Sequence, residues 1–207
     1  MSHPISGLYA IADTGLLDSH SLLEKSEAVL RGGARILQYR DKTGNVELRH
    51  QQAMALAALC TKYGAQFIIN DDIELAAELG AGVHVGKDDA ALLTARKRLG
   101  ENAIIGVSCY NDLQRALTAQ QQGASYVAFG RFFPSSSKPD AVQAQPALLQ
   151  TAKQKLSVPI VAIGGINADN AASLINAGAD AVAVIHDLFG SDDPEKAAAQ
   201  YQVLFKQ

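Results

Sequence analysis

Residues 159–185 read PIVAIGGINADNAASLINAGADAVAVI and carry the pattern that decides the fold. Two short apolar runs rich in β-branched residues, 159–163 and 181–185, enclose a stretch with the composition of a helix. We expect Asp169 to cap the start of this helix and Gly178 to turn the chain back after its end. The pattern predicts a strand–helix–strand unit whose strands are buried on both faces, as parallel sheets require.

The same unit recurs along the whole chain. Eight apolar runs are predicted as strands: 8–11, 35–39, 66–69, 82–85, 103–107, 126–129, 159–163 and 181–185. Other helix ends are marked by Gly-Ala pairs at Gly33, Gly64, Gly80 and Gly123, and other helix starts by Asp18, Asp112 and Asp193. Eight units in 207 residues average about 26 residues each, near the lower end for an eight-stranded α/β barrel.

We therefore predict an α/β fold, a single (β/α)8 TIM barrel that forms one domain over residues 1–207. A doubly wound open sheet is the alternative architecture. It is disfavoured because the first run is followed by Ala12-Asp13-Thr14-Gly15 and not by a Gly-x-Gly-x-x-Gly motif.

Composition excludes several classes of protein. Eighteen Lys and Arg against 21 Asp and Glu give a net charge of −3, without the basic excess of a nucleic-acid binder. No apolar run approaches the roughly 20 residues that span a bilayer, and Met1-Ser2-His3-Pro4 does not begin a signal peptide. Cys60 and Cys109 lack metal-ligand spacing and are interpreted as reduced thiols. We expect a cytoplasmic protein without nucleic-acid or membrane partners, and leave open whether it forms a homo-oligomer.

Polar residues follow nearly every predicted strand, at the end where such barrels carry their chemistry. Gln38 and Arg40 alternate along the second strand, so they share a face, and Lys42 follows them. Two cations and an amide aimed at one place suit an anionic, phosphorylated ligand. The alternative is an Arg40–Asp41 surface ion pair of little consequence.

Pairs of carboxylates follow the third and fourth strands. Asp71-Asp72 comes after Asn70, and Asp88-Asp89 comes shortly after the fourth strand. Carboxylates from adjacent strand ends can share a Mg²⁺ ion, whereas helix capping accounts for only one Asp in each pair. His84 lies in mid-strand and is interpreted as a hydrogen-bonded barrel histidine and not as a ligand.

The remaining strand ends also carry polar or glycine-rich segments. Ser108 ends the fifth strand, and a long loop after the sixth concentrates hydroxyls and a lysine, which favours a lid or binding loop over a linker: Ser135, Ser136, Ser137 and Lys138. Gly164-Gly165 and Ile185-His186 follow the last two strands, where such barrels bind phosphate through backbone N–H groups; the glycines could instead serve a turn. Two anion sites indicate two phosphorylated substrates or one long one. We find no Ser/His/Asp triad, reactive cysteine pair or zinc cluster in the sequence.

In chain order the motifs are Gln38-Tyr39-Arg40-Asp41-Lys42, Ile69-Asn70-Asp71-Asp72, His84-Val85-Gly86-Lys87-Asp88-Asp89, Gly106-Val107-Ser108, Pro134-Ser135-Ser136-Ser137-Lys138 and Ala162-Ile163-Gly164-Gly165-Ile166. Together they make the chain resemble the thiamine phosphate synthase family over essentially its whole length. That resemblance implies a transferase that joins 4-amino-5-hydroxymethyl-2-methylpyrimidine diphosphate to thiazole phosphate and releases diphosphate. It also implies a dissociative reaction, in which the C–O bond to diphosphate breaks first and no general base is needed.

The resemblance further implies roles for individual residues. Asp71 and Asp89 would be the ligands of a Mg²⁺ cofactor. Contacts to the pyrimidine diphosphate would come from Gln38, Arg40, Lys42, Asn70, Ser108 and Lys138, of which Arg40, Lys42, Ser108 and Lys138 are the expected catalytic residues. The thiazole phosphate would lie near Ser135 and Ser137, against the backbone of Gly165, Ile185 and His186. Tyr39, Asp41 and Ser136 belong to the same motifs and are included among the expected substrate-binding residues.

The chain also departs from the family pattern. The family often has Gln at Lys87, Thr at Ser135 and Ser137, Pro at Arg131, a small hydroxyl residue at His186 and His at Tyr110. Three other functions stay as alternatives. They are the related thiazole tautomerase, which uses a His at the position of Tyr110, a non-catalytic barrel that binds a phosphate ligand, and a phosphate-sugar isomerase. The last predicts a catalytic carboxylate or lysine inside the barrel, and the sequence offers no clear candidate.

Overall fold

Eight parallel strands close into a barrel in the computed structural model, which describes residues 5–86, 89–134 and 143–205. The strands are β1 (Gly7–Asp13), β2 (Ile36–Arg40), β3 (Gln66–Asn70), β4 (Gly82–Val85), β5 (Ile105–Tyr110), β6 (Tyr126–Gly130), β7 (Ile160–Ile163) and β8 (Ala181–Val184). Each pairs with its neighbour in the chain, and β8 pairs with β1, with Gly7 opposite Ala181. The predicted (β/α)8 barrel is confirmed, and all eight predicted strands are present.

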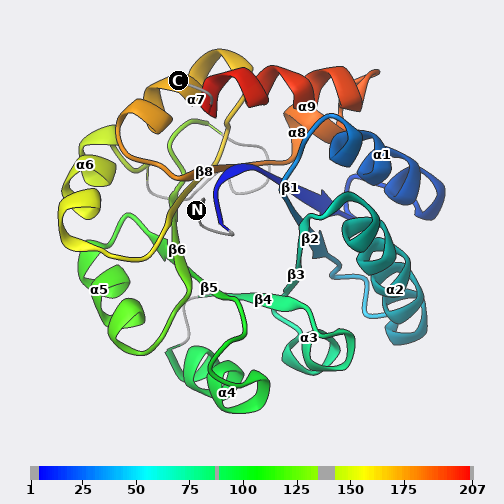
Figure 1. The fold of residues 1–207 in the computed structure, drawn as a ribbon, viewed down its shortest axis with the longest axis horizontal. Coiled ribbons are helices and arrows are strands. Elements are labelled where there is room, and N and C mark those ends of the chain that lie inside the picture. The colour runs from blue at the N-terminus through cyan, green and yellow to red at the C-terminus, as the bar shows by residue number, and fades with distance from the viewer. Residues whose placement is uncertain (1–4, 87–88, 135–142, 206–207) are drawn as a thin grey trace.

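The helices form a ring around the barrel (Figure 1). They are α1 (Ser19–Arg31), α2 (Val46–Tyr63), α3 (Ile73–Leu79), α4 (Asp89–Leu99), α5 (Leu113–Gln121), α6 (Pro146–Lys155), α7 (Ala168–Asn176), α8 (His186–Phe189) and α9 (Pro194–Gln202), followed by the 3-10 turn η1 (Val203–Phe205). None of the helices among the described residues has the length and apolar character needed to cross a membrane.

Helix caps follow the sequence pattern with one correction. Asp18, Asp112 and Asp193 cap α1, α5 and α9 as predicted. The prediction for Asp169 is wrong, because Asn167 caps α7 and Asp169 lies in its first turn. Asn167 and Asn170 each accept a hydrogen bond from the other's backbone N–H at 3.0 Å, and this reciprocal capping box places the start of the helix two residues earlier.

Glycines end the helices at the five predicted Gly-Ala pairs. Gly33, Gly64, Gly80, Gly123 and Gly178 all have positive φ. At Gly64, with φ 64°, the turn lets the next residue, Ala65, donate its N–H to the Cys60 carbonyl at 2.9 Å. A residue with a Cβ would be strained in this conformation, so glycine here directs the chain from helix back to strand.

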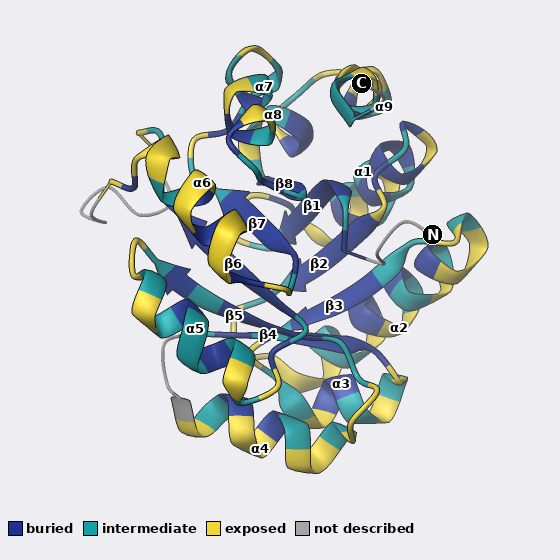
Figure 2. Ribbon diagram, turned by 60° about the vertical axis from the view of Figure 1, so that its left-hand side comes forward, coloured by how far each residue is buried: buried dark blue, intermediate teal, exposed yellow. Residues whose placement is uncertain are grey.

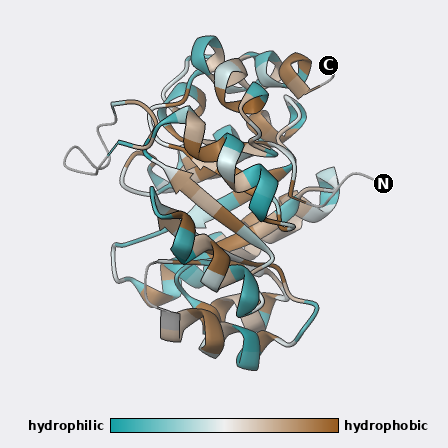
Figure 3. Cartoon of the chain, turned by 90° about the vertical axis from the view of Figure 1, so that its left-hand side faces the viewer, coloured by the Kyte–Doolittle hydropathy of each residue, from teal (hydrophilic) through white to brown (hydrophobic). Residues whose placement is uncertain are grey.

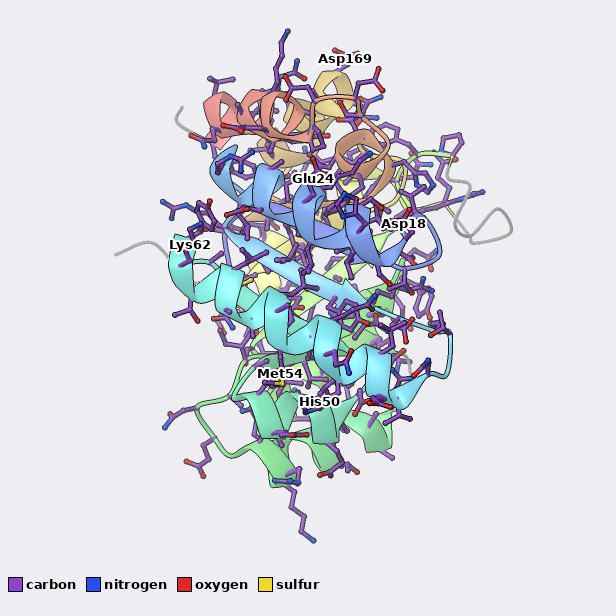
Figure 4. All side chains as sticks on the ribbon, turned by 90° about the vertical axis from the view of Figure 1, so that its right-hand side faces the viewer. Asp18, Glu24, His50, Met54, Lys62 and Asp169 are labelled. Carbon is purple, nitrogen blue, oxygen red and sulfur yellow. The ribbon has the colours of Figure 1, made fainter. Side chains whose placement is uncertain are left out.

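Two separate cores stabilise the barrel. Side chains inside it include Tyr9, Ile36, Ile68 and Tyr126, while a larger layer fills the space between strands and helices. The strands are accordingly buried on both faces, and exposed residues lie on the outer surfaces of the helices and in the connecting loops (Figure 2). Hydrophobic stretches run through the barrel strands, and hydrophilic segments appear on the surrounding helices (Figure 3). On that outer surface lie charged side chains such as Glu24 and Lys62 (Figure 4). A cavity of ligand size lies at one end of the barrel, where the strands end.

Candidate active site

A cavity of about 520 Å³ opens where the strands end. Residues from all eight strands line it, together with the segments that follow β6, β7 and β8. This volume lies within the range of small-molecule sites. Among the predicted site residues that the structure describes, those lining the cavity are Gln38, Arg40, Asn70, Ser108, Gly165, Ile185 and His186. The structure thus brings these seven predicted residues together around one cavity, at the end of the barrel where this fold carries its chemistry.

The floor of the cavity is a continuous chain of hydrogen bonds across five strands. Gln38 Nε2 donates to the Tyr9 hydroxyl at 2.8 Å, and the Tyr9 and Tyr126 hydroxyl oxygens are 2.8 Å apart. His84 Nδ1 lies 3.0 Å from the Tyr126 hydroxyl, and His84 Nε2 lies 2.9 Å from Ser108 Oγ. The interpretation of His84 as a hydrogen-bonded barrel histidine is confirmed, and its ring also lines the cavity.

This floor carries no tyrosinate charge. Burial raises the pKa of Tyr9 and of Tyr126 well above the ordinary tyrosine value. Both hydroxyls therefore keep their protons at neutral pH. A neutral floor with fixed donors and acceptors suits a polar heterocyclic ring better than an anion.

Two cationic side chains, Arg40 and Lys42, lie to one side, at the end of β2 and just after it. Gln38 and Arg40 point to the same face, as alternation predicts, and Arg40 Nη1 donates to Asp13 Oδ2. The alternative of an Arg40–Asp41 ion pair is wrong, because Arg40 pairs with Asp13. The Asp41 carboxylate accepts hydrogen bonds from other residues, Thr14 and Arg49 among them. Lys42 Nζ lies 3.9 Å from Asp71 Oδ2. Arg40 and Lys42 thus place two positive charges at one arc of the barrel mouth.

The two adjacent aspartates after β3, Asp71 and Asp72, have different backbone conformations and different hydrogen-bond partners. Asp72 caps α3, with Oδ1 accepting from Leu75 N at 3.0 Å. Asp71 has φ 63°, a conformation uncommon for non-glycine residues, and its Oδ2 accepts from Asn70 Nδ2 at 2.7 Å. The carboxylate of Asp71 is 55% exposed, so it is free of capping and reachable at the mouth.

The Asp71 carboxylate is suitable as a ligand for Mg²⁺, which takes oxygen atoms from one or two carboxylates and completes its shell with water and phosphate oxygens. The second expected ligand, Asp89, begins α4, and its side chain lies outside the described residues. Within the part of the chain that the structure describes, no three His, Cys, Asp or Glu side chains cluster as a metal site. The donor set here fits a magnesium ion shared with a phosphorylated ligand, and does not fit a closed protein cage.

Glycine-rich backbone forms another arc of the mouth, after β7 and β8. Gly164 and Gly165 have φ of 104° and 65°, and a Cβ on Gly165 would approach the Pro134 carbonyl oxygen to 2.3 Å. Asn170 Nδ2 fixes this turn by donating to the Gly165 carbonyl at 3.0 Å. Ile185 and His186 begin α8 beside it and line the cavity. Glycine is therefore needed here for the positive φ and for the close packing of the turn against the segment after β6, and the backbone of this turn lines the cavity.

Three expected substrate contacts, Tyr39, Asp41 and Lys42, do not line the cavity, and the expected metal ligand Asp71 also lies outside its lining. The Tyr39 side chain points outward to α2, where its hydroxyl donates to Gln52 Oε1 at 2.6 Å. Asp41 accepts hydrogen bonds from Thr14, Thr43 and Arg49. Both residues share a motif with Arg40 but take the opposite face of the chain. The expected contacts Ser135, Ser136, Ser137 and Lys138 lie outside the described residues.

Sequence reasoning missed several cavity residues, among them the polar Tyr9, Asp13 and Tyr126. The signal available was alternation. Tyr9, Ile11 and Asp13 occupy every second position of β1, so polar groups at both ends of the strand share the inward face. The two cysteines are confirmed as free thiols, both buried, and burial raises the pKa of Cys60 to about 12.

Comparison with known proteins gives a consistent result. The family model described as "Thiamine monophosphate synthase" matches residues 8–188. A thiamine-phosphate synthase from Nitrosococcus oceani is 54% identical over 206 residues, covering 99% of this chain and 95% of the relative. A thiamine-phosphate synthase from Thioalkalivibrio sulfidiphilus is 51% identical over 98% of this chain and 96% of its own.

Solved structures agree. Thiamine phosphate pyrophosphorylase from Pyrococcus furiosus superposes with a TM-score of 0.88 at 32% identity, covering 99% of this chain and 97% of the other. A 3-hexulose-6-phosphate synthase has a TM-score of 0.70 at 19% identity, over 96% of this chain and 99% of its own, and shares the fold alone.

Proposed function

Because the chain belongs to the thiamine monophosphate synthase family, we propose that it is a thiamine-phosphate synthase. The reaction joins 4-amino-5-hydroxymethyl-2-methylpyrimidine diphosphate to thiazole phosphate, giving thiamine phosphate and diphosphate. This makes the protein a transferase, in agreement with the names of its relatives.

The observation that carries the proposal is the presence of two anion-suited regions around one cavity. Arg40 lines the cavity at the end of β2, and the exposed side chains of Lys42 and Asp71 follow on the segments after β2 and β3. The Gly164-Gly165 turn and the start of α8 line the cavity after β7 and β8. A single monophosphate needs only one of these regions. Two phosphorylated substrates that meet over a neutral floor use both.

The chain's own residues support a dissociative reaction. In the proposed first step the bonding pair of the C–O bond leaves with diphosphate, and a cation remains on the pyrimidine-bearing carbon. Arg40 and Lys42 stabilise the charge that grows on the leaving group, because fixed cations beside a protein cavity act more strongly than in water. Lys138 is proposed to add a third cation, and Ser108 a hydroxyl contact.

Carbon–nitrogen bond formation completes the reaction. The lone pair of the thiazole nitrogen attacks the carbon, and no proton has to leave that nitrogen. A general base is therefore unnecessary, which agrees with a floor whose tyrosines stay protonated. The floor residues position the ring and exclude water, and the glycine-rich arc is proposed to bind the thiazole phosphate through backbone N–H groups.

Magnesium is part of the proposal. Asp71 and Asp89 would hold Mg²⁺, which when bound supplies positive charge to phosphate oxygens. Asn70 and Lys42 would keep the Asp71 carboxylate directed at the mouth.

The deciding experiment measures diphosphate release by the purified protein with both substrates and Mg²⁺. We expect release only when both substrates are present, thiamine phosphate as the second product, and loss of turnover in EDTA that excess Mg²⁺ restores. Conversion of a thiazole monophosphate alone, without diphosphate, would identify a tautomerase. Saturable binding of either ligand without product would identify a binding barrel.

A further inference from the structure

Four side chains tie together the ends of β1, β2 and β3, and we call them the strand-end clamp: Thr14, Asp41, Arg49 and Asp72. Thr14 Oγ1 donates to Asp41 Oδ1 at 2.6 Å. Arg49, in the first turn of α2, donates from Nε to Asp41 Oδ2 and from Nη1 to Asp72 Oδ2, both at 3.1 Å. One guanidinium therefore bonds two different strand–helix connections.

The bonds to Asp41 are shielded from solvent, whereas the side chain of Asp72 is 31% exposed. The Asp41 side chain is 2% exposed and that of Arg49 is 23% exposed. Burial acts to raise the pKa of Asp41, but hydrogen bonds from Thr14, Thr43 and Arg49 outweigh it and hold the pKa below its ordinary value. Hydrogen bonds to Asp41 and Asp72 raise the pKa of Arg49. The clamp is charged at neutral pH and is stronger than an exposed ion pair.

The clamp lies directly beside two residues of the proposed diphosphate region. Asp41 is between Arg40 and Lys42 in the chain, and Asp72 follows Asp71. The side chains of Lys42 and Asp71 are 61% and 55% exposed, yet Nζ and Oδ2 lie 3.9 Å apart. Exposed side chains have little packing of their own to fix them, so their relative position depends on the segments that carry them.

We propose that Arg49 is a positioning residue for the diphosphate region, which it orders by fixing the segments that bear Lys42 and Asp71. The inference rests on the proposed function, since it assigns to Arg49 a role in binding magnesium and diphosphate. Arg49 itself does not line the cavity. Removal of a group that orients a metal ligand typically costs roughly 10- to 100-fold in affinity or activity, and we expect R49Q to fall in this range.

The test is calorimetric binding of inorganic diphosphate with Mg²⁺, alongside steady-state kinetics and thermal unfolding. The variants are R49Q, the conservative R49K and the control R98Q. Arg98 also pairs with a carboxylate of α3, Glu74, at 2.9 Å, but from α4 and on the outer surface. We expect R49Q to bind magnesium diphosphate about 10-fold or more weakly, R49K to bind with intermediate affinity, and R98Q to bind like the wild type.

The kinetic signature separates positioning from general damage. R49Q should raise KM for the pyrimidine diphosphate and the Mg²⁺ concentration at half-maximal rate, while KM for thiazole phosphate stays within about twofold. Equal changes in both KM values, or binding unchanged from the wild type, would overturn the role of Arg49 and leave the proposed function intact. A wild-type protein that neither binds magnesium diphosphate nor forms product overturns the proposed function, and this inference with it.

A second variant avoids dependence on the folding of R49Q. In D72N the side-chain oxygen can still cap α3, because Asn is as good an N-cap as Asp, but the charge that Arg49 meets is gone. D72N should weaken magnesium diphosphate binding in the same direction, and the double variant R49Q/D72N should lose less than the product of the two single effects. If the loss of binding in R49Q/D72N equals the product of the two single losses, Arg49 and Asp72 act independently and the shared clamp is contradicted.

Discussion

Asp71 and Asp72 are chemically identical neighbours, yet the backbone gives them separate tasks. Asp72 has extended backbone and caps α3, whereas Asp71 has the left-handed conformation, at φ 63°, and its exposed carboxylate lies beside Lys42. Non-glycine residues with φ above zero are uncommon and often mark functional sites. We therefore place the proposed magnesium ligand at Asp71 and assign Asp72 a structural role.

Asp71→Asn tests this division. Asn tolerates the left-handed region, so the backbone is unstrained by the change, but the amide removes the negative charge. We expect thiamine phosphate formation to fall by at least about 100-fold, since loss of supporting groups alone reaches that level. Rates at several Mg²⁺ concentrations and the Tm are the measurements. Near-normal rates at low Mg²⁺ would remove Asp71 from the site.

His186 is the departure from the family pattern that lies at the proposed phosphate region. It begins α8, is exposed and lines the cavity. If phosphate is held by backbone N–H groups, the side chain is dispensable. His186→Ser should then change KM for thiazole phosphate by less than about threefold, equivalent to roughly 0.7 kcal/mol. A tenfold increase would show instead that the imidazole takes part in binding.

For single residues, the sequence predicted which way a side chain points only within strands, where alternate side chains share a face. Gln38 and Arg40 were placed correctly, because alternate positions of a buried strand share a face. Tyr39 and Asp41 were included among the substrate contacts because they belong to the same motif. The same alternation places their side chains on the opposite face, toward Gln52 and Arg49. Arg49 gave no local signal, since its partners lie 8 and 23 positions away in the chain.

At the scale of elements, the packing of β5 against β6 depends on the absence of a side chain at Gly106. A Cβ on Gly106 would lie 2.0 Å from Tyr126 Cζ, so glycine in β5 makes room for the tyrosine that joins the floor from β6. The need for this glycine was not predictable from the sequence, because it arises from the pairing of Gly106 with Tyr126 in the closed barrel. Element positions themselves were predictable, since they depend on local periodicity and caps.

Gly106→Ala should therefore disturb the floor. The tyrosine must move, and overpacking of a closed core costs about 1–3 kcal/mol in unfolding free energy. We expect this loss in urea titrations, together with a raised KM for the pyrimidine diphosphate. Gly86→Ala is the stability control, because a Cβ there meets nothing within 4 Å. Equal stability of the two variants would contradict the packing argument.

At the scale of the molecule, the last helix packs against the first beside the β8–β1 pairing that closes the barrel. A Cβ on Gly32 would approach the Glu195 carbonyl oxygen to 2.3 Å, so α1 and α9 pack at close range. Tyr201 of α9 is fully buried and donates to Asp187 Oδ2 at 2.6 Å, and Asp187 lines the cavity. The repeat of eight units predicted the barrel, but contacts between its first and last helices depend on closure and have no counterpart in local sequence.

Four buried tyrosines distributed around the barrel make the free energy of unfolding of the whole molecule depend on pH in the alkaline range. Burial raises the pKa of Tyr9, Tyr39, Tyr126 and Tyr201 in the folded state. In the unfolded chain these groups lose their protons near pH 10. Above that pH the unfolded state binds fewer protons than the native state, so the free energy of unfolding decreases as pH rises.

Each such tyrosine contributes a slope of at most about 1.4 kcal/mol per pH unit, and the contribution is fully retained below the unfolded-state pKa. Urea unfolding at intervals from pH 8 to 11.5 should show stability falling steeply above about pH 10. Tyr39→Phe removes one of the four groups at a position outside the cavity. Its stability curve should converge on that of the wild type as pH rises, because it lacks one titrating proton. Curves that stay parallel above pH 10 would show that Tyr39 ionises equally in both states.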